Sequence, residues 1–422
     1  MRYRAPRGTT DILPEEQVYW RYVQECASSL AETFGYGRID TPIFEDTGLF
    51  VRTVGEATDI VDKEMYTFED RGSDQVTLRP EGTAPVCRAY LEHGMHNLPQ
   101  PVRLYYQISL FRYDRPQAGR YRQFHQFGVE AIGDSDPAVD AEVIELAWRF
   151  YERLGLQGLT LALNSIGDKT CRPLYLERLV EYYTPHVEHL CQDCQARIHR
   201  NPLRLLDCKQ LSCQPYIAEA PVSTESLCDD CREHWGRLTT HLGDLGIAYS
   251  VDHRLVRGLD YYSRTVFEIL PPEEGSQSTL CGGGRYDGLM EQLGGKPTPG
   301  IGFALGIERT ILNLKRQGVT VPDQSTTAVA IAHMGEAGGR EAVKLAAQLR
   351  SAKTSTILLP GQKSLKGQMR HAGSLGARYV VIIGDKEAAN GVATVRDLAA
   401  AEQREVPLGE VIAAVSQDHS HD

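Results

Sequence analysis

The chain has 422 residues, of which 41% are hydrophobic and 24% are charged, and its formal net charge is −11. This composition is typical of a globular protein of two or three domains and excludes disordered and fibrous chains. No apolar stretch approaches the ~18 residues of a membrane span, and no apolar run follows the basic residues at the start, so we expect neither a membrane protein nor a secretory signal.

The first segment, up to about Leu163, mixes aromatic-rich strand patterns with helices. Its best helical pattern follows SDPAVDAEV, where apolar residues recur every three or four positions. We expect Ser135 to cap this helix and Gly155 to end it. A second segment, about residues 166–235, holds most of the ten cysteines and is interpreted as an insertion.

The third segment, Leu255 to Leu314, returns to strands, glycine turns and a final helix. Residues 316–327 have no periodicity and are interpreted as a linker. Strand patterns then alternate with helical ones, which predicts a small α/β domain with a largely parallel sheet at 328–422. The segment from Thr326 to the end contains 11 basic and 10 acidic residues. The negative charge therefore lies earlier in the chain, and composition by itself does not suggest RNA binding.

The stretch Leu104–Gly133 predicts a long antiparallel hairpin whose turn carries several arginines, namely Arg112, Arg115, Arg120 and Arg122. Arginines on a rigid hairpin suit bidentate binding of phosphate. A solvated charged loop is the alternative interpretation.

Two carboxylates stand out. Glu130 lies in an apolar strand pattern, QFGVEAIG, and needs a partner there, for which a core ion pair with one of the arginines is one explanation. Glu81, in LRPEGTAP, falls between a strand end and a helix start. It is placed either to receive an ammonium group or to stabilise the N-terminus of the helix through its dipole.

The third segment carries three further motifs. VRGLDYY sets Arg257 beside Tyr261 and Tyr262 just before a strand, and CGGGRYDG predicts a turn in which the backbone approaches another group closely. GIGFALGIER combines a glycine-rich strand with a helix that carries Arg309. Its glycine spacing is not that of a dinucleotide loop, and no βαβ unit surrounds it, so nicotinamide binding is excluded.

Taken together, LRPEGT, FRYDRPQAGRYRQFHQ, VRGLDYY, GGGRYDGL and GIGFALGIER closely resemble histidyl-tRNA synthetases, a class II aminoacyl-tRNA synthetase family. The resemblance extends from RAPRGTTDILP near the start to VVIIG in the last segment. It implies an α+β fold: an antiparallel-sheet catalytic domain (1–315) with a helical insertion, followed by an α/β anticodon-binding domain. It also implies a homodimer, and YGRIDTPIFED resembles the class II dimerisation motif, with Pro42 in its expected place.

The resemblance implies a histidine–tRNA ligase that activates L-histidine with ATP and Mg²⁺ and then charges tRNA(His). Arg112, Arg120 and Arg309 would bind ATP, with Arg112 on the α-phosphate and Arg309 on the γ-phosphate. Arg257 and Arg112 would be the catalytic residues beside the reacting carboxylate. Arg115 and Gln117 in the hairpin loop would reach the acceptor end of the tRNA. We expect a cytoplasmic protein, with neither DNA nor a membrane among its partners.

Histidine itself would be held by residues from four motifs. Glu81, Thr83 and Gln126 would hold its α-amino group, and Glu130 with Tyr262 would bind the two imidazole nitrogens. The full set that the resemblance implies for histidine is Glu81, Gly82, Thr83, Arg112, Gln126, Glu130, Arg257, Tyr261 and Tyr262. A site that pairs both nitrogens rejects analogues unable to hydrogen-bond by roughly 10⁴–10⁵, so no editing domain is needed.

The cysteines leave a metal question open. Cys191 with Cys194, and Cys228 with Cys231, form two CxxC pairs that suggest a structural zinc site. The separation of the pairs is longer than the ~15–20 residues of the usual pattern, and the family does not require a metal here. Reduced, partly buried thiols are therefore the favoured interpretation, without a bound metal.

A regulatory protein is the alternative function. A synthetase-like paralogue supports ATP phosphoribosyltransferase by binding histidine without catalysis, but it typically lacks the anticodon domain and has degraded catalytic arginines. This chain retains Arg257 and the C-terminal segment, which favours the synthetase.

Overall fold

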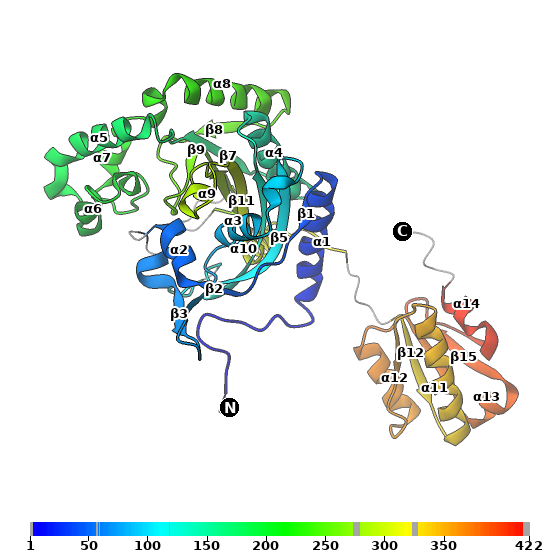
Figure 1. The fold of residues 1–422 in the computed structure, drawn as a ribbon. Helices are drawn as coiled ribbons and strands as arrows, with labels where there is room; N and C mark the ends of the chain where they lie inside the picture. Colours follow the sequence, from blue (N-terminus) through cyan, green and yellow to red (C-terminus); the bar gives the residue numbers. More distant parts are fainter. Residues whose placement is uncertain are drawn as a thin grey trace. The chain divides into compact units, whose positions relative to one another are not determined.

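The computed structural model describes residues 3–55, 58, 60–117, 119–272, 279–322 and 328–416. The chain divides into two compact units, Met1–Val321 and Pro322–Asp422, each with its own sheet (Figure 1). The interpreted linker, 316–327, begins on the last residue of a helix, and its residues 323–327 lie outside the described residues. Among the described residues, no helix has the length and apolar character needed to span a membrane.

An eight-stranded sheet is the centre of the first unit, with the strand order β1-β5-β6-β11-β10-β9-β7-β8. Neighbouring strands are antiparallel except for the pairs β1–β5 and β7–β8. The strands are β1 (Gly37–Arg38), β5 (Val102–Phe111), β6 (Gln123–Ile132), β7 (Thr160–Ser165), β8 (Tyr249–Val251), β9 (Ser263–Leu270), β10 (Cys281–Arg285) and β11 (Gly300–Gly306). The predicted long hairpin is confirmed as β5 and β6, paired from Val102↔Ile132 to Phe111↔Gln123.

The consecutive glycines of CGGGRYDG form the central strand β10, so the predicted turn is wrong while the predicted close approach is confirmed. A Cβ atom at Gly283 would overlap the carbonyl oxygen of Gly302 on β11 and would also come close to the ring of Phe267 on β9. Glycine is used here because strands on both sides approach this backbone.

Alternating side chains give the sheet two buried faces. Phe127 and Val129 pack on one face with helices α1, α4 and α10, whereas Tyr106 and Ile132 face the insertion and α3. The helices outside the insertion are α1 (Gln17–Thr33), α2 (Thr47–Val54), α3 (Thr83–Glu92), α4 (Pro137–Arg153), α9 (Leu289–Gln292) and α10 (Ile307–Arg316). Figure 1 shows α1 and α4 together on one side of the sheet.

The predicted helix after SDPAVDAEV is α4, and its predicted end at Gly155 is confirmed, since this glycine adopts φ +81°. Its predicted cap is wrong. Asp136, not Ser135, accepts the hydrogen bond from the backbone N–H of Ala138 (2.8 Å). Pro137 suits the first helical position, which places the cap one residue later than expected.

Two smaller parts complete the unit. A three-stranded sheet, β2-β4-β3, is formed by β2 (Phe44–Asp46), β3 (Tyr66–Glu69) and β4 (Gln75–Leu78). The insertion is helical as expected. It contains α5 (Arg172–Tyr183), α6 (Gln192–Arg197), α7 (Gln214–Ala218) and the start of α8 (Asp229–Asp244), the green helices of Figure 1.

The second unit has the five-stranded order β13-β12-β14-β15-β16, and the predicted alternation of strands and helices is confirmed. The sheet is mixed rather than largely parallel, because β15 and β16 pair antiparallel at one edge. Its elements are β12 (Val329–His333), α11 (Glu336–Ser351), β13 (Thr356–Leu358), α12 (Leu365–Ser374), β14 (Tyr379–Ile383), α13 (Asp385–Asn390), β15 (Val392–Asp397), β16 (Glu402–Pro407) and α14 (Val411–Ser416).

Candidate active site

The first unit contains a cavity of about 870 Å³ that is lined by arginines from separate parts of the chain. Arg112 follows the end of β5, Arg120 lies in the hairpin loop, Arg257 precedes β9 and Arg309 lies on α10. The same four side chains line an adjoining cavity of about 290 Å³. Four guanidinium groups around one space form a site for a polyanion such as a triphosphate.

Only part of the predicted hairpin cluster contributes to these two cavities. Arg112 and Arg120 line them, but Arg122 packs over the ring of Tyr113 at 3.8 Å from the centroid. Arg115 and Gln117 are exposed on the loop. The tertiary fold thus replaces half of the cluster with Arg257 and Arg309.

Backbone carbonyls hold two of the cavity arginines in place. Arg112 donates from Nε to the carbonyl oxygen of Pro80 (2.8 Å), and Arg309 donates from Nε to that of Gly119 (2.9 Å). Arg309 also donates to the carbonyl oxygen of Thr279 (2.8 Å). Arg120 pairs with Asp114 at 2.6 Å, so the loop carboxylate positions this arginine. Because neutral carbonyls position Arg112 and Arg309, their charge is not cancelled by these contacts.

Arg257 is held by a charged partner and an aromatic ring. It forms an ion pair with Glu268 on β9, and its guanidinium lies over the ring of Tyr262 at 5.9 Å from the centroid. Burial opposes its charge, but Glu268 and Tyr262 outweigh burial and raise the pKa of Arg257 above its ordinary value. Arg257 therefore stays protonated at every working pH.

Gly282 on β10 provides the space for this guanidinium, because a Cβ atom there would overlap it. We expect Gly282→Ala to displace Arg257 and to lower the turnover of the adenylation reaction that the resemblance implies by about 10²-fold, since small displacements of a positioning group have effects of that size. Pyrophosphate-exchange kinetics measure this. Gly288→Ala is the matched control, because a Cβ atom at 288 meets nothing within 4 Å. Equal rates in the two variants would contradict the prediction.

The second part of the site is a pair of buried carboxylates, Glu81 and Glu130, which are 4% and 0% exposed. Thr83 links them: its backbone N–H donates to Glu81 Oε2 and its hydroxyl donates to Glu130 Oε1, both at 2.8 Å. Glu81 also accepts from the N–H of Ala84 (2.8 Å), so the stabilisation of the helix start that the sequence offered as one alternative is present. Burial raises the pKa of Glu81, while these backbone hydrogen bonds and the charge of Arg112 oppose that rise.

Hydroxyl groups, not an arginine, are the described partners of Glu130, which makes the suggested core ion pair wrong. Tyr286 donates to Oε2 (2.6 Å), and Thr83 and Tyr106 donate to Oε1 (2.8 and 3.3 Å). A Cβ atom at Gly302, opposite Glu130 in the sheet, would overlap this carboxylate, so β11 leaves room for it. Burial raises the pKa of Glu130 to about 8, against the lowering effect of the three hydroxyls.

This shift predicts a pH dependence of stability. The folded pKa of about 8 lies above the ordinary value of ~4.3, so the folded state holds a proton that the unfolded state loses. The free energy of unfolding should therefore fall as pH rises between these values, with the loss complete above about pH 8. Urea unfolding of the wild type and of Glu130→Gln between pH 5 and 8.5, analysed by linear extrapolation, should show a smaller fall in the variant, roughly by 1 kcal/mol or more. Parallel curves for the two proteins would contradict it.

The other residues expected to bind the substrate histidine belong to the same part of the site as Glu81 and Glu130. Tyr261 donates its hydroxyl to Glu81 Oε2 (3.4 Å), and Gln126 on β6 lines the smaller cavity. Tyr262 is fixed through its backbone, whose carbonyl oxygen accepts from Arg172 Nη2 of the insertion (2.6 Å). Gly82 lies against Tyr106, whose hydroxyl would be 2.7 Å from a Cβ atom at that position. The residues expected to bind histidine thus come from four separate segments of the chain.

The sequence did not predict a role in the site for four of its residues, namely Tyr106, Glu268, Thr279 and Tyr286. Tyr106 and Tyr286 bond Glu130, whereas Glu268 and Thr279 line both cavities. A usable signal existed for Tyr106, because it occupies an inward position of the β5 alternation and pairs with a glycine, Gly128. Glu268 gave a similar signal as a single acid within the strand RTVFEIL.

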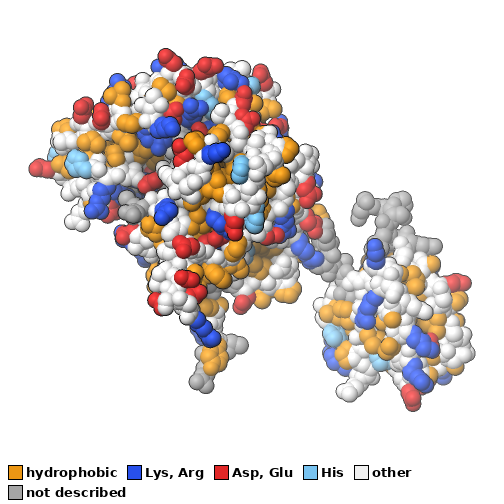
Figure 2. Space-filling model, viewed as in Figure 1, with side chains coloured by type: hydrophobic (Ala, Val, Ile, Leu, Met, Phe, Trp, Pro, Cys, Tyr) orange, Lys and Arg blue, Asp and Glu red, His pale blue; other side chains and the backbone are white. Residues whose placement is uncertain are grey.

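On the face shown in Figure 2, basic and acidic side chains of the first unit are interspersed, so this surface does not share the concentration of arginines found in the two cavities. The larger cavity, in contrast, is lined by more basic than acidic residues. Its basic lining residues are Arg112, Arg120, Arg204, Lys209, Arg254, Arg257 and Arg309, and its acidic ones are Glu64, Asp207, Asp252 and Glu268. A local excess of positive charge thus exists in a protein of net charge −11.

Comparisons with known proteins show the family of the chain. A family model described as histidyl-tRNA synthetase matches residues 8–168 and 188–310, and one described as an anticodon binding domain matches residues 328–418. A relative from Dehalococcoides mccartyi, named histidine–tRNA ligase, is 57% identical over 98% of this chain and 99% of its own length.

Two solved structures also resemble the chain. Apo histidyl-tRNA synthetase from S. aureus is 41% identical with a TM-score of 0.84, covering 98% of this chain and 99% of that chain. A structure from Bacillus halodurans C, described as an ATP phosphoribosyltransferase regulatory subunit/histidyl-tRNA synthetase, is 23% identical with a TM-score of 0.67, covering 91% of this chain and 99% of that one. At 23% identity, the similarity to the Bacillus halodurans structure shows a shared fold alone.

Proposed function

The chain belongs to the histidyl-tRNA synthetase family and is a histidine–tRNA ligase, and we propose that the two adjoining parts of the site divide its reaction between them. The arginine-lined cavity binds ATP, and the buried carboxylate pair binds histidine. One observation carries this division: Arg112 lines the cavity and donates to the carbonyl oxygen of Pro80, the residue before Glu81, so it lies between the two parts.

Activation joins the two substrates at this boundary. An oxygen of the histidine carboxylate attacks the α-phosphorus of ATP, the bond from that phosphorus to the bridging oxygen breaks, and pyrophosphate leaves. The step needs positive charge around the phosphorus and correct alignment more than proton transfer. Arg112 and Arg257 supply that charge beside the carboxylate and the α-phosphate, and Arg309 and Arg120 bind the leaving phosphates. The 3′-terminal ribose hydroxyl of the tRNA then attacks the activated carbonyl, and AMP leaves.

Mg²⁺ fits this site by the chemistry of its donors. Four carboxylates line the cavity, namely Glu64, Asp207, Asp252 and Glu268, and Mg²⁺ prefers oxygen ligands. Glu64 and Glu268 would hold the ion, which would supply positive charge against the phosphates of ATP. Glu268 additionally accepts from the hydroxyl of Thr279 (2.8 Å), which holds the carboxylate at the wall of the cavity.

Selectivity for histidine rests on Glu130 and Tyr262, which bind the two imidazole nitrogens. The α-amino group is held by Glu81, Thr83 and Gln126. Amino acids without two ring nitrogens leave the hydroxyl of Tyr262 and the remaining acceptor capacity of Glu130 unused in a buried site, which penalises their binding strongly.

The tRNA contacts involve both units. Arg115 and Gln117, exposed on the hairpin loop, reach the acceptor end, and residues 328–422 bind the anticodon. The catalytic domain comprises residues 1–315 with its insertion at about 166–235, and residues 316–327 are the linker. Ten free cysteines are consistent with a reducing cytoplasm.

The catalytic unit works as a homodimer. Ile43 and Phe44, next to Pro42 of the motif that resembles the class II dimerisation motif, are 51% and 54% exposed in the single chain. Adjacent exposed apolar side chains favour burial against another subunit. Sedimentation equilibrium should give twice the chain mass, and Phe44→Glu should shift the protein toward the monomer.

Histidine-dependent ATP–pyrophosphate exchange tests the activity with each of the twenty amino acids in turn. Exchange with histidine alone, followed by charging of tRNA(His), is the expected result. Histidine binding without any exchange would instead support the non-catalytic regulatory function.

A further inference from the structure

The seven cysteines of the insertion region form two separate groups, neither of which combines the two CxxC pairs. Cys191 and Cys194 meet Cys208 and Cys213, whereas Cys228 and Cys231 meet Asp168 and Cys171. The idea of one site built from both CxxC pairs is therefore wrong. The long spacing between the pairs, which argued against zinc, no longer applies, because the first pair takes its partners from a segment only 14 residues further on.

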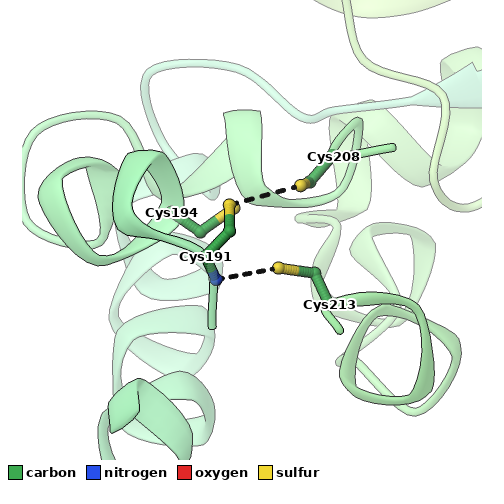
Figure 3. A group of neighbouring side chains, drawn as sticks. All are labelled: Cys191, Cys194, Cys208 and Cys213. Carbon is green, nitrogen blue, oxygen red and sulfur yellow. Dashed lines mark hydrogen bonds between the residues drawn. The ribbon is translucent and has the colours of Figure 1, made fainter. Parts of the chain in front are cut away.

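The four sulfur atoms of the first group have the spacing of a metal tetrahedron. The ligand atoms of Cys191, Cys194, Cys208 and Cys213 all lie within 4.8 Å of one another, and the sulfurs of Cys191 and Cys208 are 3.7 Å apart. A tetrahedron with Zn–S bonds of ~2.3 Å has edges of roughly 3.8 Å. A disulfide would instead bring two sulfurs to ~2.0 Å. In Figure 3 the four side chains point toward one another, two from the turn at 191–194 and two from the segment 208–213.

We propose that Cys191, Cys194, Cys208 and Cys213 bind one zinc ion as a tetrahedral four-thiolate site. The ligand chemistry favours zinc, because soft thiolates in a tetrahedral set select zinc over the hard cations that accompany ATP. A closed set of four protein ligands leaves no position for substrate, so the ion is structural.

The surroundings suit thiolate ligands. The backbone N–H of Cys191 donates to Cys213 Sγ (3.3 Å), and the N–H of Gln210 donates to Cys208 Sγ (3.4 Å). Such donors orient metal-bound sulfurs and compensate part of their charge. Cys194 and Cys213 are buried, which closes the site to solvent on that side.

The ion would hold a wall of the larger cavity. The segment between the ligands carries Arg204, Leu206 and Lys209, which line the 870 Å³ cavity together with Cys208 itself. This segment between the cysteines has little regular structure of its own and includes the short 3₁₀ turn Pro202–Leu205. Zinc would thus join the turn at 191–194 to this wall and fix the position of two basic side chains.

The second group provides an internal control, because its carboxylate is engaged. Asp168 pairs with Arg264 at 3.2 Å and accepts from the backbone N–H of Thr170 (2.9 Å). Three cysteines and an engaged carboxylate form a weaker ligand set than four thiolates, and the proposal does not include it.

Metal analysis of the full chain, purified under reducing conditions with zinc supplied and then desalted, tests the proposal. We expect Cys208→Ser/Cys213→Ser to carry one zinc per chain less than the wild type. Cys228→Ser/Cys231→Ser should retain the zinc of the first group. Three results would overturn the proposal. The wild type could contain no zinc, it could contain iron or copper in place of zinc, or the wild type and Cys208→Ser/Cys213→Ser could contain equal amounts of zinc.

Cobalt substitution tests the ligands without any mutation, so it remains informative if the variant folds poorly. Co²⁺ bound by the metal-free wild-type chain should give the intense visible absorption of tetrahedral coordination together with a thiolate-to-metal charge-transfer band. Zinc should displace both signals at one equivalent. Weak octahedral bands without charge transfer would overturn the proposal, whatever the activity of the enzyme.

Discussion

Replacing Arg257 with alanine should lower histidine-dependent ATP–pyrophosphate exchange by at least ~10³-fold while histidine binding remains measurable. Arginines that stabilise a transferring phosphoryl group contribute ~10³–10⁵-fold to rate, because their charge acts on the transition state in a water-poor site. The variant also leaves Glu268 without its ion-pair partner beside the polyphosphate, which adds repulsion to the lost attraction. The loss should therefore appear in kcat rather than in the dissociation constant of histidine.

The measurement combines exchange kinetics with calorimetric titration of histidine. Arg149→Ala is a suitable control, because it removes another arginine with a glutamate partner (Arg149–Glu152, 2.7 Å) on the outer surface of α4. Its exchange rate should match the wild type. Near-normal exchange by Arg257→Ala would show that this guanidinium does not act on the reacting phosphate.

Replacing Glu130 with glutamine should lower kcat/KM for histidine by roughly 10- to 10²-fold and leave the KM for ATP nearly unchanged. A bound ring N–H favours the ionised form of Glu130 over the protonated form of the empty site, and a buried hydrogen bond to a charged group contributes about 1.5–3 kcal/mol. The amide cannot accept on both atoms as the carboxylate does. The three hydroxyls of Thr83, Tyr106 and Tyr286 converge on Glu130, so the amide also disturbs their arrangement. Selectivity against amino acids that lack the imidazole nitrogens should decrease together with the affinity.

Exchange kinetics at varied histidine and at varied ATP separate these two effects. Glu142→Gln is the matched control, since Glu142 likewise accepts from a tyrosine hydroxyl (Tyr36, 3.2 Å), although its other partner is an arginine (Arg103, 2.8 Å), and it lies outside both cavities. An equal loss for histidine and ATP in Glu130→Gln would indicate general disruption of the site and would count against a specific contact with the imidazole.

Local patterns in the sequence determined most of the elements. The apolar spacing after Pro137 specifies α4, the paired aromatic runs specify the β5–β6 hairpin, and strand and helix patterns alternate through the last unit. These features depend on residues close together in the chain, so they are visible without a structure. The shared motifs likewise determined the family, because their order and content are properties of the sequence alone.

The partners of the functional side chains were decided by the tertiary structure. Glu130 needed a partner by its burial, but only the approach of α3, β5 and the end of β10 makes that partner a set of hydroxyls rather than an arginine. Two of the four arginines that line both cavities, Arg257 and Arg309, lie far from the hairpin in the sequence, and no local pattern shows that they meet Arg112.

The cysteines show the same division. The CxxC spacing identified candidate ligands, but it did not indicate that Cys191 and Cys194 meet Cys208 and Cys213, while Cys228 and Cys231 meet Asp168. Hydrophobic periodicity reports which face of an element is buried, and a side chain's partner on another element depends on how the elements pack. The sequence by itself thus determined the elements, the family and the candidate chemistry, and only the tertiary structure decided which of those side chains act together.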